Sequence, residues 1–191
     1  MKTNTSTQFT DYTQPTPLVK NALANIPPGR ALDIGSYAGR NALYLVHLGW
    51  EVTAIDTDAI ALNTLQATAA RGNLKITTRQ ADVRNYQPKD QFDAILCLMV
   101  LHFLPEQDIA PTIAKMQEWT KPQGTNIVTA FTDGNLPGTR PYLFPSGRLK
   151  ELYKSWHITS YEETYSSWII PEGKTEPERY MVARLVAEKK K

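Results

Sequence analysis

The strongest structural signal in this chain is the stretch Arg30-Ala-Leu-Asp-Ile-Gly-Ser-Tyr-Ala-Gly-Arg-Asn-Ala-Leu-Tyr-Leu-Val46. A short apolar run ends at Asp33, and Gly35, Tyr37 and Gly39 follow at every second position before a helical pattern begins. A strand that ends in a carboxylate and turns through glycines lets its backbone come close to a ligand. The stretch therefore predicts a strand, a ligand-binding turn and a helix, in that order.

On both sides of this stretch, apolar runs alternate with helical patterns. Continuous apolar strands separated by helices indicate a parallel sheet covered on both faces, and right-handed crossovers make that sheet doubly wound. The last two strands follow one another without a helix, which favours an antiparallel pair at the sheet edge. The predicted fold class is α/β, a doubly wound and mostly parallel seven-stranded sheet with an antiparallel C-terminal strand pair. Strands are expected over residues 30–34, 51–55, 75–81, 92–98, 124–130, 156–163 and 178–186, and helices over residues 17–26, 38–48, 58–71, 106–119 and 146–155.

The composition favours a globular protein without unusual surface chemistry. The 191 residues are 41% hydrophobic and carry a net charge of +2, so we expect no strong attraction to nucleic acid. A single cysteine fits a reducing compartment, residues 1–10 lack the apolar core of a secretion signal, and residues 95–104 are too short to cross a bilayer. We therefore expect a cytoplasmic protein with a flexible lead-in over residues 1–13 and a single domain over residues 14–191.

The spacing of the glycines indicates which ligand the turn binds. Nicotinamide and flavin sites use the pattern G-x-G-x-x-G, whose middle glycine lets the backbone approach a pyrophosphate. Here Tyr37 replaces the middle glycine, the third glycine comes one position early, and Asp33 would repel a pyrophosphate. The turn suits a cationic nucleoside better, which favours S-adenosylmethionine. A nicotinamide-dependent oxidoreductase remains the less favoured alternative.

Acidic residues stand at the ends of the first three predicted strands, namely Asp33, Asp56 and Asp82. Ligands of such sheets bind beyond the carboxyl ends of the strands. There Asp56 can accept both hydroxyls of a ribose, and Asp82 can accept a hydrogen bond from an adenine amino group while the amide of Val83 reaches a ring nitrogen. The alternative is that each aspartate only caps the helix or turn that follows it.

Further motifs extend this signal along the chain. They are Ala31–Gly35, Gly39–Leu45, Gly49–Asp56, Thr120–Gly124, Pro141–Phe144 and Leu149–Trp156. With these motifs the chain resembles the class I S-adenosylmethionine-dependent methyltransferases, and within them most closely the tellurite-resistance methyltransferase group. The resemblance extends from about Phe9 to the C-terminus.

The resemblance implies a Rossmann-like methyltransferase fold that binds S-adenosylmethionine and releases S-adenosylhomocysteine. It places the methionine end of the cofactor along the glycine turn, the ribose and adenine at the next two strand ends, and the ammonium group at the backbone after the fourth strand. Arg40 could pair with the carboxylate of the cofactor or with a neighbouring aspartate. The residues assigned to the cofactor are Asp33, Gly35, Ser36, Tyr37, Gly39, Arg40, Asp56, Thr57, Asp82, Val83, Cys97 and Leu98.

Two features depart from the pattern of that family. Tyr37 stands where glycine is usual, so its ring either points to solvent or lies over the cofactor. The family carries a His-Arg pair near the C-terminus, whereas residues 168–171 read Trp-Ile-Ile-Pro here. The second departure weakens the transfer of tellurite activity and leaves a non-catalytic S-adenosylmethionine-binding protein as an alternative.

The candidate residues for catalysis and substrate binding follow the fourth and fifth strands. His102 is the catalytic candidate, with a structural or substrate-lining role as the favoured alternative to a general base. Arg140, Tyr142 and Phe144 lie in a long loop and could line a pocket for the methyl acceptor, or the prolines there simply stiffen the surface. We predict no metal site.

The acceptor is expected to be a small molecule. The segment after the fourth strand lacks the Asn/Asp-Pro-Pro-Tyr/Phe signature that positions an amino nitrogen of nucleic acids or glutamine. A thiol, a chalcogen oxyanion such as tellurite or selenite, or another small metabolite fits better. An in-line displacement on a sulfonium-activated methyl group needs positioning more than a strong catalytic group. We expect a monomer or a homodimer that binds neither nucleic acid nor membranes.

Overall fold

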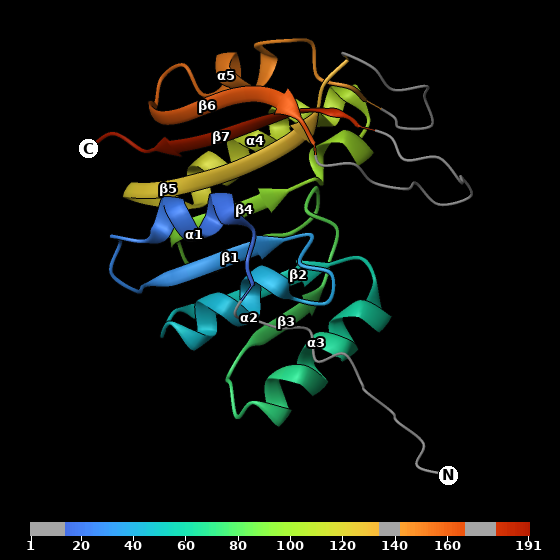
Figure 1. Cartoon of the computed structure of the whole chain (residues 1–191), viewed down its shortest axis with the longest axis vertical. Coiled ribbons are helices and arrows are strands. Elements are labelled where there is room, and N and C mark those ends of the chain that lie inside the picture. Colours follow the sequence, from blue (N-terminus) through green and yellow to red (C-terminus); the bar gives the residue numbers. More distant parts are fainter. Residues whose placement is uncertain (1–13, 134–141, 167–178) are drawn as a thin grey trace.

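The computed structural model describes residues 14–133, 142–166 and 179–191. Its strands are β1 (Arg30–Ile34), β2 (Glu51–Asp56), β3 (Thr77–Gln80), β4 (Phe92–Leu98), β5 (Thr120–Phe131), β6 (His157–Tyr165) and β7 (Met181–Glu188). Within the described residues they form one seven-stranded sheet in the order β3-β2-β1-β4-β5-β7-β6 (Figure 1).

The direction of the strands divides this sheet into two parts. From β3 to β5, every neighbouring pair is parallel. The C-terminal strand β7 is antiparallel to both β5 and β6, and β6 forms the edge. The prediction of a mostly parallel, doubly wound sheet with an antiparallel C-terminal pair is therefore confirmed.

Helices cover both faces of the sheet. The helices are α1 (Pro17–Leu23), α2 (Arg40–His47), α3 (Ala59–Arg71), α4 (Glu106–Trp119) and α5 (Arg148–Leu152), with the short 3-10 helix η1 (Leu101–Phe103) before α4. Buried side chains of α1, α2 and α3 pack against one face, and those of α4 and α5 pack against the other. Among the described residues, none of these helices combines the length and the apolar character that a membrane span requires.

Several element boundaries differ from the prediction for local reasons. Helix α2 begins at Arg40 rather than at residue 38, because Gly39 has a φ of 87° and ends the turn before it. Likewise, α5 begins after Gly147, whose φ is 77°, and spans only five residues. Strand β5 begins at Thr120 rather than at residue 124, because it already pairs with Phe92 of β4 there. Helix α3 follows the N-cap Asp58, whose carboxylate accepts hydrogen bonds from the amides of Ile60 and Ala61.

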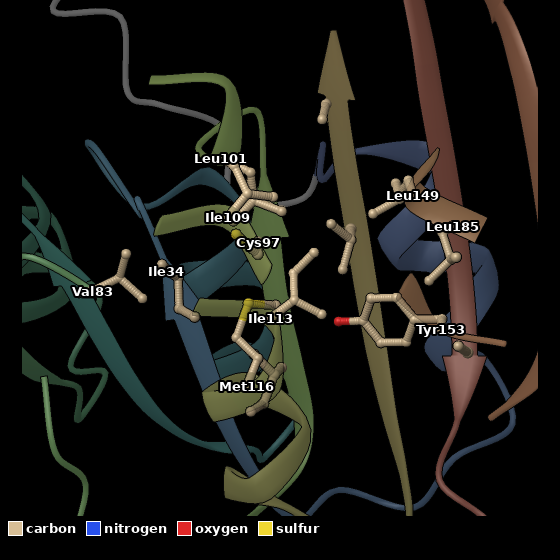
Figure 2. Close-up of a cluster of buried hydrophobic side chains, with 14 of the residues drawn as sticks. Ile34, Val83, Cys97, Leu101, Ile109, Ile113, Met116, Leu149, Tyr153 and Leu185 are labelled. Atoms are coloured by element: carbon tan, nitrogen blue, oxygen red, sulfur yellow. The ribbon is translucent and has the colours of Figure 1, made fainter. Parts of the chain in front are cut away.

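A buried polar chain crosses the core between the sheet and α5. The hydroxyl of Thr120 donates to Oδ1 of Asn126 at 2.8 Å, and Nδ2 of Asn126 donates to the hydroxyl oxygen of Tyr153 at 3.0 Å. All three side chains are fully buried. Figure 2 shows the Tyr153 hydroxyl pointing into the apolar cluster, toward Ile113. These hydrogen bonds let β5 carry the side-chain amide of Asn126 inside an apolar core, because a buried polar group is tolerated when it is hydrogen-bonded.

Replacing Tyr153 by phenylalanine is expected to lower the free energy of unfolding by about 1–2 kcal/mol, because Nδ2 of Asn126 loses its buried acceptor. Urea unfolding followed by circular dichroism measures the change. Tyr44→Phe, at a half-buried tyrosine on α2, serves as the control and should stay within about 0.5 kcal/mol of the parent. Equal effects of the two substitutions would show that the hydrogen bond contributes nothing.

Candidate functional site

A cavity of about 570 Å³ opens beyond the carboxyl ends of the four neighbouring parallel strands β1, β2, β3 and β4. Its walls come from segments 34–37, 55–57, 81–84 and 98–104, each of which continues one of these strands. In open α/β sheets ligands bind at this end of the strands. The position of the cavity therefore matches the position predicted for a ligand.

The cavity separates the residues predicted for the cofactor into two groups. Those that line it are Gly35, Tyr37, Asp56, Thr57, Asp82, Val83 and Leu98. Those that do not are Asp33, Ser36, Gly39, Arg40 and Cys97. The first group contains a residue from the continuation of each of the four strands, so the fold brings together side chains that are far apart in the sequence.

The turn after β1 is tied to its neighbours on both sides. The backbone amides of Gly35 and Ser36 both donate to the carbonyl oxygen of Ile55, at 2.8 and 3.1 Å. Gly35 has a φ of 68°, and a Cβ atom at this position would lie 2.2 Å from Cγ2 of Val100. Only glycine avoids both the left-handed strain and this clash, so the turn can approach the segment after β4.

Asp56 at the end of β2 holds the same turn and faces the cavity. Its Oδ2 accepts a hydrogen bond from the amide of Tyr37 at 2.8 Å, and its Oδ1 accepts one from the amide of Asp58 at 2.9 Å. Each carboxylate oxygen has a further lone pair, so Asp56 can still accept hydrogen bonds from a ligand. The bond to Asp58 is a turn bond, so part of the turn-forming alternative is true for Asp56, whereas the helix cap is Asp58, which binds two amides of α3.

Asp82 after β3 is paired with a residue that the sequence analysis missed. The Arg84 side chain binds the Asp82 carboxylate, with Nη2 to Oδ2 at 2.6 Å, and also reaches Asp108 of α4 at 3.2 Å. The hydrogen bond from this guanidinium lowers the pKa of Asp82 below its ordinary value. The amide of Arg84 donates to Oδ1 as well, so part of the turn-forming alternative is true. The basic residue two positions after Asp82 was the available signal.

Asp33 and Cys97 lie behind the cavity wall. Asp33 is 3% exposed, and its carboxyl group accepts a hydrogen bond from the backbone amide of Ala42 in α2. Burial raises the pKa of Asp33 to about 7, although the charge of Arg40 opposes the shift. Burial likewise raises the pKa of the Cys97 thiol. Asp33 therefore anchors the turn to α2 from within the protein.

The raised pKa of Asp33 predicts a pH dependence of stability. The unfolded carboxyl group ionises near pH 4, whereas the folded one holds its proton up to about pH 7. The folded state therefore binds more protons over this range, and stability falls as the pH rises through it. Asp33→Asn should remove this part of the slope, so the variant should gain stability relative to the parent between pH 4 and 7. Urea midpoints at unit pH steps measure it, and a constant difference would contradict it.

The candidates for catalysis and acceptor binding form an aromatic block beside the cavity. His102 is fully buried, and its ring centroid lies 4.4 Å from that of Phe103 and 4.5 Å from that of Phe131. Phe103 lines the cavity but His102 does not. Tyr142 is half-buried and Phe144 fully buried, and neither lines the cavity. Arg140 and residues 168–171 lie outside the described residues.

The chemistry of the cavity suits a nucleoside-containing ligand. Asp56, Asp82 and Arg84 form a polar side, whereas segment 98–104 contributes mainly apolar side chains. Carboxylates can accept sugar hydroxyls and a base amino group, and apolar side chains can cover the faces of a base. In the part of the chain that the structure describes, no three His, Cys, Asp or Glu side chains group in a way that would hold a metal ion.

Comparison with known proteins identifies a family for this chain. The family described as "Tellurite resistance protein TehB" matches residues 2–169. The "Probable S-adenosyl-L-methionine-dependent methyltransferase TehB" of Haemophilus influenzae (strain 10810) is 34% identical over 148 residues, which cover 76% of this chain and 52% of the relative. "Hemagglutinin 1" of Eikenella corrodens is 28% identical over 174 residues, covering 90% and 58%. The chain thus spans about half the length of the curated relatives that it matches.

Solved structures agree with this assignment. TehB from Haemophilus influenzae superposes with a TM-score of 0.83 at 30% identity, covering 90% of this chain and 61% of that chain. The N-methyltransferase NodS from Bradyrhizobium japonicum WM9 shares the fold, with a TM-score of 0.70 at 17% identity and 94% of both chains covered. The resemblance found in the sequence motifs is confirmed. The chain belongs to the TehB family.

Proposed function

We propose that this chain transfers the methyl group of S-adenosylmethionine to a small-molecule acceptor. The observation that carries the proposal is the placement of Asp56 and Asp82 on one cavity, beside a glycine turn that lacks the spacing of a pyrophosphate site. The names of the TehB relatives support the same reaction.

The residues on the cavity fit this cofactor. Asp56 would accept the ribose hydroxyls with the lone pairs that Tyr37 and Asp58 leave free. Asp82, fixed by Arg84, would accept the amino group of adenine, with the amide of Val83 beside it. The turn from Gly35 would follow the methionine end, with Thr57 near the ribose. Ser36, Gly39 and Asp33 would act from behind the wall, and Cys97 and Leu98 would contribute backbone groups. Arg40 is exposed at the start of α2, where its Nη2 donates to Oγ1 of Thr16 at 2.9 Å, so it would act from outside the cavity.

When bound, S-adenosylmethionine supplies a methyl group that its sulfonium has already activated. The protein then has to hold the acceptor in line with that methyl group and exclude water. Positioning of this kind can lower a barrier by about 7–11 kcal/mol. Segment 98–104 provides the apolar wall for it. His102 is buried among aromatic rings, so we assign it a packing role beneath that wall rather than a proton transfer.

A soft nucleophile is the acceptor that such a site serves best, because it needs no general base. We propose a small thiol or a chalcogen oxyanion such as tellurite or selenite, and the name of the tellurite resistance family supports the second. Tyr142 and Phe144 would back the acceptor pocket, and Arg140 remains a candidate for its rim. The mild net charge and the single cysteine support a cytoplasmic protein that does not act on nucleic acid. We further propose that it is a monomer or a homodimer that does not bind membranes.

The experiment that tests this proposal incubates the chain with S-adenosylmethionine carrying a labelled methyl group and with tellurite, selenite or small thiols. We expect S-adenosylhomocysteine to form only when an acceptor is present, and the label to appear in that acceptor. Calorimetric titration with S-adenosylmethionine and with NAD runs in parallel. Binding without turnover on any acceptor would favour the non-catalytic alternative, and binding of NAD alone would favour an oxidoreductase.

A further inference from the structure

We propose that the ring of Tyr37 caps the mouth of the cavity over bound S-adenosylmethionine and so contributes directly to cofactor affinity. The inference rests on the proposed function, because it takes this cofactor as the occupant. It assigns a role to the residue at which the chain departs most clearly from a glycine turn.

The backbone at Tyr37 is in a conformation that a tyrosine rarely adopts. Its φ is 48°, in the left-handed region that favours glycine. Among the described residues, the other non-glycine residues with positive φ are Asn73, Met99 and Gln123. Asparagine tolerates this region. This leaves Tyr37, Met99 and Gln123 as strained residues. Tyr37 and Met99 both line the cavity, so the strain is concentrated where a ligand would bind.

The side chain of Tyr37 does not compensate for this strain by burial. Tyr37 is 67% exposed, so most of its ring lies in water. It also lines the cavity, and a residue that is both cavity-lining and exposed lies at the mouth. A glycine at this position would avoid the strain and lose little packing. The ring is thus free to gain contacts in another state, and a ligand in the cavity would supply them.

The position of the ring is coupled to the ribose site. The amide of Tyr37 donates to Oδ2 of Asp56 at 2.8 Å, and Asp56 is the carboxylate proposed to hold the ribose. Gly35 and Ser36, just before it, are bonded to Ile55 of β2. The backbone on which the ring stands is thus fixed next to Asp56. A ligand bound through Asp56 would come within reach of the ring and bury it.

Tyr37→Gly separates the two effects of this residue. Removing the strain should raise the melting temperature by about 2–4 °C. Removing the cap should weaken S-adenosylhomocysteine binding roughly five- to tenfold, measured by calorimetry. Tyr37→Phe should bind within about twofold of the parent, because it keeps the ring. The matched control is Gln123→Gly, at an exposed residue with a φ of 65° outside the cavity, which should raise the melting temperature without changing the affinity.

The outcomes are distinct. A Tyr37→Gly variant that binds S-adenosylhomocysteine as tightly as the parent overturns the cap and leaves the proposed function intact. A melting temperature that falls below that of Gln123→Gly overturns the cap too, because both variants add the entropy of one glycine to the unfolded chain and the excess loss would show that the ring serves the fold. A parent chain that binds neither S-adenosylmethionine nor S-adenosylhomocysteine contradicts the proposed function itself and the cap with it.

Discussion

Asp56→Ala is expected to weaken the binding of S-adenosylmethionine by about 1–3 kcal/mol, roughly fivefold to 150-fold. Two losses combine in this variant. The carboxylate no longer accepts the ribose hydroxyls, and the amides of Tyr37 and Asp58 lose the acceptors that shape the turn. Calorimetric titration of the purified variant measures the change.

The neighbouring acid provides a matched control for Asp56. Asp58 accepts from two amides at the start of α3 but does not line the cavity. Asp58→Ala should therefore lower the free energy of unfolding by about 1 kcal/mol, as the loss of a helix cap does, and leave the affinity unchanged. If the two alanine variants bound the cofactor equally well, Asp56 would not be the ribose ligand.

Gly35→Ala is expected to destabilise the protein by about 2–5 kcal/mol, which combines left-handed strain with overpacking. The new methyl group would lie 2.2 Å from Cγ2 of Val100, so the turn after β1 and the segment after β4 would have to separate. Both segments line the cavity, and cofactor binding should be lost as well. Urea unfolding and calorimetry measure the two effects.

Two further variants separate the clash from the strain. Gly147 has a φ of 77°, and a Cβ atom there would meet nothing within 4 Å. Gly147→Ala should therefore cost only the strain, about 1–2 kcal/mol. Adding Val100→Ala to Gly35→Ala removes the clashing side chain and should restore part of the lost stability. Equal costs for Gly35→Ala and Gly147→Ala, with no effect of Val100→Ala, would contradict the close contact of the two segments.

The order of the elements could be predicted from the sequence because their signals are local. The glycines after β1 indicate a turn, and the position of Asp58 before a helical pattern indicates a helix cap. The antiparallel pairing of the C-terminal strands could also be predicted from the sequence, because no helix separates the last two predicted strands. In each case the residues that carry the signal are the residues that form the structure.

The start of β5 and the ion pair between Arg84 and Asp108 could not be predicted, because they depend on partners far along the chain. Strand β5 begins at Thr120 only because Phe92 offers it a partner. Arg84 is a site residue because the fold places its side chain between Asp82 and Asp108 of α4. The sequence contains both acids, but their common partner follows from the place of α4 in the fold, which brings Asp108 to Arg84.

From the sequence, Asp33 and Asp56 are both predicted to bind the cofactor, because both stand at strand ends. Their environments differ because Asp33 lies inside β1, in register with Ala54, whereas Asp56 is the last residue of β2 and lies two positions further toward the carboxyl edge. Ala31, two residues before Asp33, packs on the face that α2 covers, whereas Leu32 and Ile34 pack on the other face. Asp33 thus points to α2 and is buried there, while Asp56 extends past the sheet into the cavity.

A crystal structure with S-adenosylhomocysteine tests the central claim most directly, because the claim concerns where one nucleoside lies. We expect the ribose hydroxyls within hydrogen-bonding distance of the Asp56 carboxylate and the adenine amino group at Asp82. A ligand bound elsewhere on the chain, or one inside the cavity whose ribose and base contact neither carboxylate, would contradict the account.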